Sequence, residues 1–328
     1  MTLPAGNDAA HAAFAAAMAG DTLHHAWLFA GPEGIGKASF ARAAAVRLLA
    51  EAAAPDTLEP GFDVPENHQT RRLIEAGSHP DYRELKRLPK ESDKTGQELA
   101  RSIPIAQVRA LLPMFAMKPS LSPRRVVLID AIDDVERPGA SNALLKSLEE
   151  PPAGTIFILV SHAPGRLLPT IRSRCRLLRF DPLDEGDMTR IVREHLGSAD
   201  DAEVAALVRA GAGSPGRALG FAGLDLAALD GVLSAIARDG DRSNARRVKL
   251  AKALAVKAAQ PRYEAFLDRA PAFIAESARN RRGEGLRTAL DSYDAARALS
   301  ASARALSLDA QGTVYEMAGL VAKLAAPA

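Results

Sequence analysis

The chain has 328 residues, of which 47% are hydrophobic and 25% charged, and its formal net charge is +2. This length indicates two or three domains, and the composition is that of an ordinary folded protein, which excludes disorder of the whole chain. A net charge so close to zero gives no global argument for nucleic-acid binding, although a local basic face is compatible with it.

Cys175 is the only cysteine of the sequence. One cysteine forms no internal disulfide and cannot supply a four-ligand zinc site, so we expect no zinc and interpret Cys175 as a small buried side chain in a reducing compartment. The sequence shows no signal-peptide pattern, and no apolar run approaches the roughly 20 residues that cross a bilayer. We therefore expect a cytoplasmic protein.

Residues 1–181 alternate strand-like and helix-like segments. Near-continuous apolar runs are typical of strands that are buried on both faces of a parallel sheet. Helical patterns begin at Lys37 and cover residues 108–115 and 142–150. This alternation predicts an α/β fold with a doubly wound parallel sheet. The expected strands are residues 26–30 (AWLFA), 126–129 (VVLI), 155–161 (TIFILVS) and 175–180 (CRLLRF).

Residues 51–103 interrupt this alternation. Three prolines and a glycine fall between residues 55 and 65, and charged residues gather at residues 90–94. Proline and glycine break regular structure, so we interpret the segment as an insertion with irregular, mostly solvated structure.

The rest of the chain carries helical patterns without a strand signal. Residues 182–224 predict three short helices, with a turn-rich break at residues 211–216. Residues 225–328 predict a larger, entirely helical region. The sequence thus divides into an α/β domain, a small helical domain and a larger helical domain.

The sharpest motif is residues 31–38 (GPEGIGKA), between the first expected strand and its helix. Glycines let backbone N–H groups turn toward a polyphosphate, the helix N-terminus adds positive potential, and Lys37 would reach the β and γ phosphates. The last position of such a loop is normally Ser or Thr, whose hydroxyl binds Mg²⁺, and here it is Ala38. The motif predicts the ancestry of a phosphate-binding loop, and it leaves open whether ATP or ADP still binds. The structural alternative is a glycine turn that caps a helix.

A second motif ends the expected strand at residues 126–129 with Asp130. A carboxylate at this place beside a phosphate-binding loop normally holds Mg²⁺. In an active ATPase of this kind a glutamate follows and polarises the attacking water, whereas here Ala131 follows. The alternative is that Asp130 only caps the next helix. No general base stands at the required position, so we expect no independent catalysis.

Arg174 lies in Ser173-Arg174-Cys175, just before the last expected strand. An arginine can stabilise the charge on a transferring γ-phosphoryl group, including one that is bound to a neighbouring subunit. Several arginines cluster here, so a solvated basic strand edge is the ordinary alternative.

Together these segments resemble the clamp-loader subunits of bacterial DNA polymerase III, a family of AAA+ proteins. Residues 141–152 (SNALLKSLEEPP) look like the signature helix of the family, and residues 167–175 (LLPTIRSRC) look like its Ser-Arg-Cys segment. Residues 24–37 (HHAWLFAGPEGIGK) look like its N-terminal nucleotide box. The likeness covers about residues 20–220. It implies an AAA+ nucleotide-fold domain over residues 1–181, a helical lid over residues 182–224 and a helical collar for oligomerisation over residues 225–328.

Departures from the family pattern indicate which branch the chain resembles. Motor subunits of the family keep the Mg²⁺-binding hydroxyl, the catalytic glutamate and a zinc module of four cysteines, whereas this chain has Ala38, Ala131 and one cysteine. Delta prime subunits keep Ser-Arg-Cys while their own site decays, which is the pattern here. In active relatives an arginine also stands where Gly216 stands in this sequence. The segment 51–103, which lacks the zinc cysteines, would fold without metal.

By this resemblance the chain would be a largely non-hydrolysing stator in a heteropentameric ring with motor (tau/gamma) and delta subunits. The ring opens the sliding clamp and places it on primed DNA during replication, while nucleotidyl transfer belongs to other subunits of the polymerase. Arg174 would act in trans on the ATP site of a neighbour. The alternatives are an active motor ATPase and a P-loop kinase or transferase. The candidate nucleotide-binding residues are Gly31, Pro32, Glu33, Gly34, Ile35, Gly36, Lys37, Ala38, Asp130 and Ser161.

Overall fold

The structure is a computed structural model that describes residues 4–20, 23–90 and 99–325. The chain forms two compact units. The first runs to Asp187 and includes residues 213–216, and the second consists of residues 188–212 and the chain from Arg217 onward. The boundary expected at residue 225 between a lid and a collar stays a prediction.

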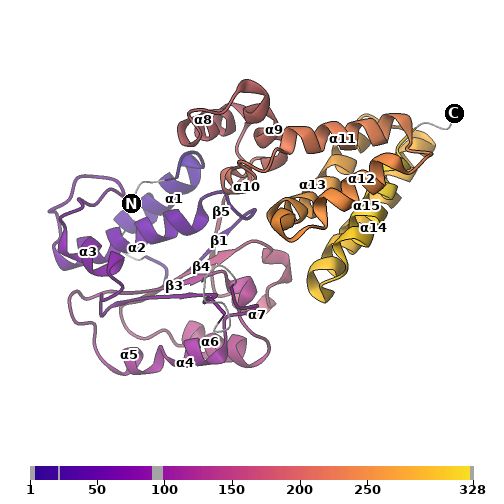
Figure 1. The fold of residues 1–328 in the computed structure, drawn as a ribbon. Coiled ribbons are helices and arrows are strands. Elements are labelled where there is room, and N and C mark those ends of the chain that lie inside the picture. The colour runs from indigo at the N-terminus through magenta and orange to yellow at the C-terminus, as the bar shows by residue number, and fades with distance from the viewer. Residues whose placement is uncertain (1–3, 21–22, 91–98, 326–328) are drawn as a thin grey trace. The chain divides into compact units, whose positions relative to one another are not determined.

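The first unit contains a five-stranded sheet in the order β2-β3-β4-β1-β5, in which every neighbouring pair is parallel (Figure 1). Asp130 at the end of β3 is in register with Val160 of β4, and Ala30 at the end of β1 is in register with Ser161. The carboxyl ends of the central strands therefore meet at one edge, where α/β sheets bind ligands. The strands are β1 (Ala26–Ala30), β2 (Tyr82–Lys86), β3 (Arg125–Asp130), β4 (Thr155–Ser161) and β5 (Arg176–Arg179).

Helices cover both faces of this sheet (Figure 1). Successive residues of a strand point to opposite faces, so Trp27 and Phe29 join one apolar cluster while Leu28 joins the other. This confirms the predicted α/β fold with buried parallel strands. The first cluster packs against α1 (Asp8–Ala19), α2 (Lys37–Ala53) and α3 (Gln69–Glu75), and the second against α4 (Ile105–Arg109), α5 (Leu112–Ala116), α6 (Gly139–Glu149) and α7 (Pro169–Arg172).

The prediction of an irregular, mostly solvated insertion at residues 51–103 is wrong at one helix and one strand, while most of the other described residues of the segment are irregular. The segment contains α3 and the edge strand β2, and Ile74 and Leu85 are buried in the two clusters. Strand β2 (YRELK) was missed because this edge strand has only two apolar residues, Tyr82 and Leu85, and lacks a continuous apolar run. Residues 91–98, which include most of the charged stretch, lie outside the described residues.

The predicted helix over residues 108–115 is in fact two short helices, α4 and α5. Pro113 is the second residue of α5, where its missing N–H is tolerated, whereas in the interior of one continuous helix it would remove a backbone hydrogen bond. The predicted helix over residues 142–150 corresponds to α6 and is confirmed. Two short 3₁₀ turns, Ile132–Asp134 and Pro164–Arg166, follow β3 and β4.

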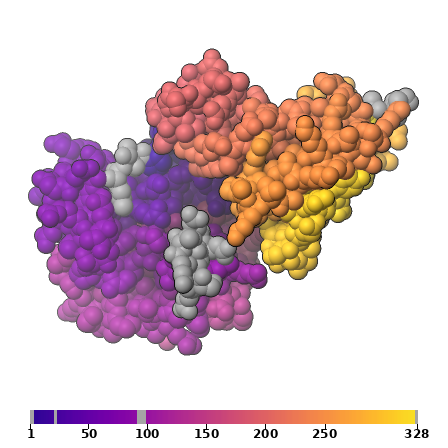
Figure 2. Space-filling model, in the orientation of Figure 1, coloured from indigo at the N-terminus to yellow at the C-terminus, as the bar shows by residue number. Residues whose placement is uncertain are grey.

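The second unit is helical, and no strand follows Arg179 among the described residues. In Figure 2 helices α11 to α15 form the orange to yellow part of the surface. Across the described ranges, no helix is both long and apolar enough to cross a membrane. The helices after the sheet are α8 (Glu185–His195), whose first residues belong to the first unit, α9 (Asp201–Gly211), α10 (Pro215–Gly220), α11 (Leu226–Asp239), α12 (Ala245–Leu254), α13 (Gln260–Ala278), α14 (Gly283–Leu306) and α15 (Ala310–Ala322), with a 3₁₀ turn at Lys257–Ala259.

Candidate functional site

The loop at residues 31–36 connects β1 to α2 at the carboxyl edge of the sheet. Gly36 has a φ of 95°, a backbone conformation that favours glycine. Within the described residues, the backbone N–H groups of Gly34, Ile35 and Gly36 donate to no other group. Free N–H groups in front of a helix N-terminus form a cradle for an anion, so the loop has the geometry that phosphate binding requires.

Lys37 lies in this loop with only 2% of its surface exposed. Its Nζ donates to the carbonyl oxygens of Gly31 (2.7 Å) and Pro32 (2.5 Å). Burial lowers the pKa of Lys37 to about 8, against the opposing effect of Glu33, Asp130 and Asp133. The ammonium is therefore close to the loop and to Asp130, as the sequence predicted.

Residues 213–216 pack directly against the loop within the first unit. The N–H of Gly216 donates to the carbonyl of Gly34 (2.8 Å), and the hydroxyl of Ser214 donates to the carbonyl of Glu33 (2.7 Å). A Cβ at position 216 would lie 2.9 Å from that carbonyl oxygen of Gly34, so a larger residue would displace the loop. Position 216 therefore lies so close to the backbone of Gly34 that an arginine there would displace the loop.

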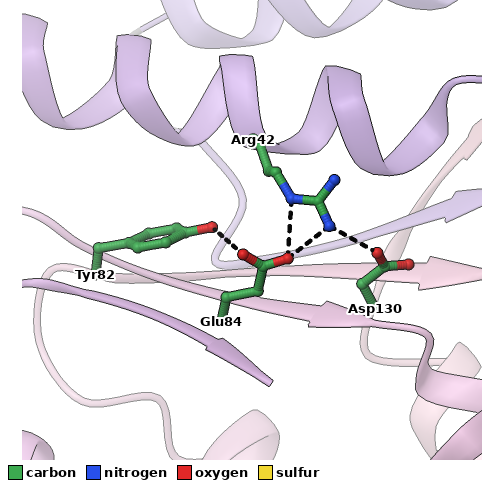
Figure 3. Close-up of polar contacts among 4 residues, drawn as sticks. All are labelled: Arg42, Tyr82, Glu84 and Asp130. Carbon is green, nitrogen blue, oxygen red and sulfur yellow. Dashed lines mark hydrogen bonds and ion pairs between the residues drawn. The ribbon is translucent and has the colours of Figure 1, made fainter. Parts of the chain in front are cut away.

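Asp130 does not stand free at the end of β3 (Figure 3). Its Oδ2 accepts from Nη2 of Arg42 (3.0 Å), and the same nitrogen donates to Oε1 of Glu84 (2.6 Å). Nε of Arg42 donates to that Glu84 oxygen as well (2.9 Å), and the Tyr82 hydroxyl donates to Oε2 of Glu84 (3.5 Å). Burial alone would lower the pKa of Arg42, but Glu84 and Asp130 raise it above its ordinary value. Arg42 therefore stays charged and bridges two strands.

Arg42 and Glu84 were not predicted from the sequence to contribute to this site. Arg42 lies five residues after Lys37 on α2, and Glu84 lies on the strand that was taken for part of an irregular insertion. The apolar Tyr82 and Leu85 are the only strand signal that residues 82–86 offer, and they do not alternate with period two. The pairing of β2 with β3 also depends on tertiary structure.

Asp133 organises the turn after β4. Its carboxylate accepts from the Ser161 hydroxyl (3.1 Å) and from the N–H groups of His162 (2.7 Å) and Ala163 (3.2 Å). Ser161 is fully buried, and its hydroxyl hydrogen is used in this bond. A nucleotide contact of Ser161 stays a prediction.

Arg174 lies in the turn between α7 and β5. Its Nη1 donates to the carbonyl of Thr170 (2.8 Å), and its Nη2 forms an ion pair with Oε1 of Glu149, the last residue of α6 (2.6 Å). One third of the Arg174 side chain is exposed. Within the described part of the chain, no hydrogen bond or ion pair joins Arg174 to Lys37 or Asp130. The arginine is therefore held at the surface, separate from the cluster around Asp130.

Cys175, next to Arg174, is half-buried and packs against the apolar cluster on the α6 side of the sheet. Burial raises the pKa of its thiol to about 12. The thiol therefore stays protonated at neutral pH, which suits the expected packing role.

Comparison with known proteins identifies the family. Residues 6–184 match the family model described as DNA polymerase III, delta subunit. The delta′ subunit of DNA polymerase III from Pseudomonas aeruginosa is 41% identical over 46% of this chain and 41% of its own length. The delta′ subunit from Bacillus subtilis is 36% identical over 50% of this chain and 44% of its own length.

The similarity extends to another type of subunit. The tau subunit of DNA polymerase III from Escherichia coli is 32% identical over 65% of this chain and 31% of its own length. Each of the three alignments spans less than half of the length of the relative. More than half of this chain matches the family model, and both relatives with the higher identity are delta′ subunits. The chain therefore belongs to the family described as DNA polymerase III, delta subunit.

Proposed function

We propose that the chain is a stator of the clamp loader: it hydrolyses little or no ATP itself and supplies Arg174 to the ATP site of a neighbouring motor subunit. The observation that carries this proposal is the position of Arg174. Its side chain is one third exposed in the turn before β5, where an ion pair with Glu149 holds it apart from the cluster around Asp130. An arginine at the surface is accessible to the γ-phosphate of another subunit.

The state of the chain's own nucleotide site supports the same role. Ala131 has no carboxylate to polarise water, and Ala38 has no hydroxyl for a metal ion. The loop amides keep the geometry of an anion cradle, so bound ATP or ADP would serve assembly or stability rather than turnover.

A tau subunit among the relatives supports a partner of the motor type, and the other partners of this proposal rest on the family resemblance. The partners would be motor subunits of the tau/gamma type and a delta subunit in a pentameric ring, with the sliding clamp and primed DNA as the substrates of the whole assembly. The site of action would be the cytoplasm. Nothing in this role requires the chain to carry out nucleotidyl transfer.

The test is Arg174→Ala in a clamp loader reconstituted with its clamp and primed DNA. A trans-acting arginine stabilises charge that develops in the transition state, and its loss slows one site on the order of 10³-fold. Only the site that faces this subunit should fail, so we expect a partial loss of phosphate release and of clamp loading. Arg174→Lys should rescue poorly, because lysine lacks the planar fork of donors.

The matched control is Arg172→Ala. Arg172 lies two residues away, is exposed and donates only weakly to the carbonyl of Pro164 (3.5 Å). Arg172→Ala should leave the rates of phosphate release and clamp loading unchanged. As a second control, the isolated wild-type chain should release no phosphate. If an assembled Arg174→Ala complex releases phosphate and loads the clamp at wild-type rates, Arg174 is only a surface residue and the proposed trans role is wrong.

A further inference from the structure

The fold of the nucleotide site implies a magnesium ion, and the residues of this chain do not fit one. In phosphate-binding loops of this kind Mg²⁺ is held by a hydroxyl at the end of the loop and by the aspartate at the end of the neighbouring strand. The first position is Ala38, which offers no oxygen. The second is Asp130, whose Oδ2 accepts a hydrogen bond from Arg42.

The guanidinium of Arg42 is fixed in place by more than one contact. It reaches down from α2 onto the sheet and donates to both Glu84 and Asp130, which lie on adjacent parallel strands (Figure 3). The three side chains are only 16–28% exposed. Paired charges in such a place are less screened than pairs on the surface, and the fork of Arg42 matches the carboxylates geometrically.

The cations already near Asp130 also disfavour a divalent ion. Arg42 is ion-paired with Asp130 and Glu84, and Lys37 is close enough to Asp130, Glu33 and Asp133 to be influenced by their charges. A divalent ion bound at Asp130 would add two positive charges beside the guanidinium, in a partly buried place where like charges repel strongly.

We infer that Arg42 replaces the divalent cation of this nucleotide site, by occupying the carboxylate of Asp130 that would otherwise help to hold the ion. The inference concerns the cation alone and holds whether or not the chain acts in a clamp loader. A nucleotide in this loop would consequently bind as a metal-free polyphosphate.

The test measures Mn²⁺ binding to the purified full chain by the decrease of the electron paramagnetic resonance signal of free Mn²⁺. The wild-type chain should show no Mn²⁺ site that depends on Asp130. Arg42→Ala frees two neighbouring carboxylates, and Mn²⁺ affinity should rise at least about tenfold. The double variant Arg42→Ala, Asp130→Asn should lose that gain.

Three further variants keep this experiment decisive. Arg83→Ala removes an exposed arginine of β2 that donates only to the carbonyls of His79 and Tyr82, and it should bind no Mn²⁺. Arg42→Lys keeps a cation and should exclude Mn²⁺ as the wild type does. Arg42→Gln keeps a neutral donor of similar length, and it replaces Arg42→Ala if circular dichroism shows that the alanine variant is unfolded.

Two outcomes would overturn the inference. One is a wild-type chain that binds Mn²⁺ at a site removed by Asp130→Asn, because the guanidinium would then not exclude the ion. The other is a folded Arg42→Ala or Arg42→Gln chain that binds no more Mn²⁺ than the wild type. In that case something other than Arg42 would keep metal from Asp130.

Discussion

Burial changes the pKa of one side chain beside each candidate site: Lys37 at the loop of residues 31–36 and Cys175 next to Arg174. Lys37 and Cys175 are ordinary residues in the sequence, yet burial lowers the pKa of the first to about 8 and raises that of the second to about 12. The effect has the same physical origin in both cases, because a low-dielectric environment favours the neutral form. Cys175 gives the cleaner test, since it is the only thiol of the chain.

We predict that Cys175 is almost inert to iodoacetamide at pH 8 in the folded protein. Only the thiolate reacts, and a thiol with a pKa of about 12 is ionised to about one part in 10,000 at that pH. Because the pKa is raised, the alkylation rate should keep increasing with pH up to the limit of folding. Denaturant should restore the rate of a free peptide thiol.

The control moves the single thiol by two residues. Ser173 is exposed, so the double variant Cys175→Ser, Ser173→Cys should react at nearly the rate of a free peptide at pH 8. Equal rates for the wild-type and double-variant proteins would show that burial does not control the thiol.

At this scale the sequence identified the residues that carry local motifs and missed those that meet through tertiary structure. Lys37 and Asp130 follow apolar strands, so their position at the carboxyl edge of the sheet could be predicted. Arg42 and Glu84 are 42 residues apart, and the contact between them exists only because β2 lies beside β3. Similarly, Glu149 and Arg174 both lie in recognisable motifs, but no local pattern indicates that they form an ion pair.

Among the elements of the second unit, α11 and α13 are joined by an ion-pair cluster around a buried arginine, whose carboxylate partners Asp230 and Glu276 are 13% and 35% exposed. Arg269 of α13 is 2% exposed and donates to both oxygens of Asp230 (2.6 and 3.0 Å) and of Glu276 (2.6 and 3.0 Å). It lines a hollow of about 560 Å³ that α9, α11 and α13 surround. Removing the arginine would leave two carboxylates without their partner.

We predict that Arg269→Ala lowers the free energy of unfolding of the second unit by about 3–5 kcal/mol, the cost of breaking a buried pair from one side. Denaturant titration of the full chain by circular dichroism measures this change. Arg304→Ala is the matched control: Arg304 also bridges helices, through Asp268 (2.7 Å), but both side chains are at least 40% exposed. An exposed pair contributes less than about 1 kcal/mol. Similar losses in the two variants would contradict the role assigned to the cluster around Arg269.

The sequence predicted these elements unevenly, for physical reasons. Strands β1, β3 and β4 are buried on both faces, so their apolar runs are continuous and easy to recognise. The edge strand β2 has no continuous apolar run, and α4 and α5 were merged because the apolar spacing continues across Pro113. Apolar periodicity predicted that the second unit is helical, but it did not predict that Arg269 pairs with Asp230.

At the scale of the whole molecule, the first unit carries the nucleotide fold and the family match, which covers residues 6–184. The second unit lies entirely outside that match, so its expected role in oligomerisation rests on the sequence resemblance. The central claim is therefore assembly: this chain should enter a ring with motor and delta subunits.

The most direct test of that claim is the mass of the complex in solution. The purified chain, of 34.7 kDa, would be mixed with tau/gamma-type and delta-type subunits from the same organism and examined by native mass spectrometry. We predict one heteropentamer that contains a single copy of the chain, forms equally with Arg174→Ala and does not form when the chain is left out. If the chain stays at its own mass while all partners are present and folded, the account of this protein as a clamp-loader subunit is contradicted.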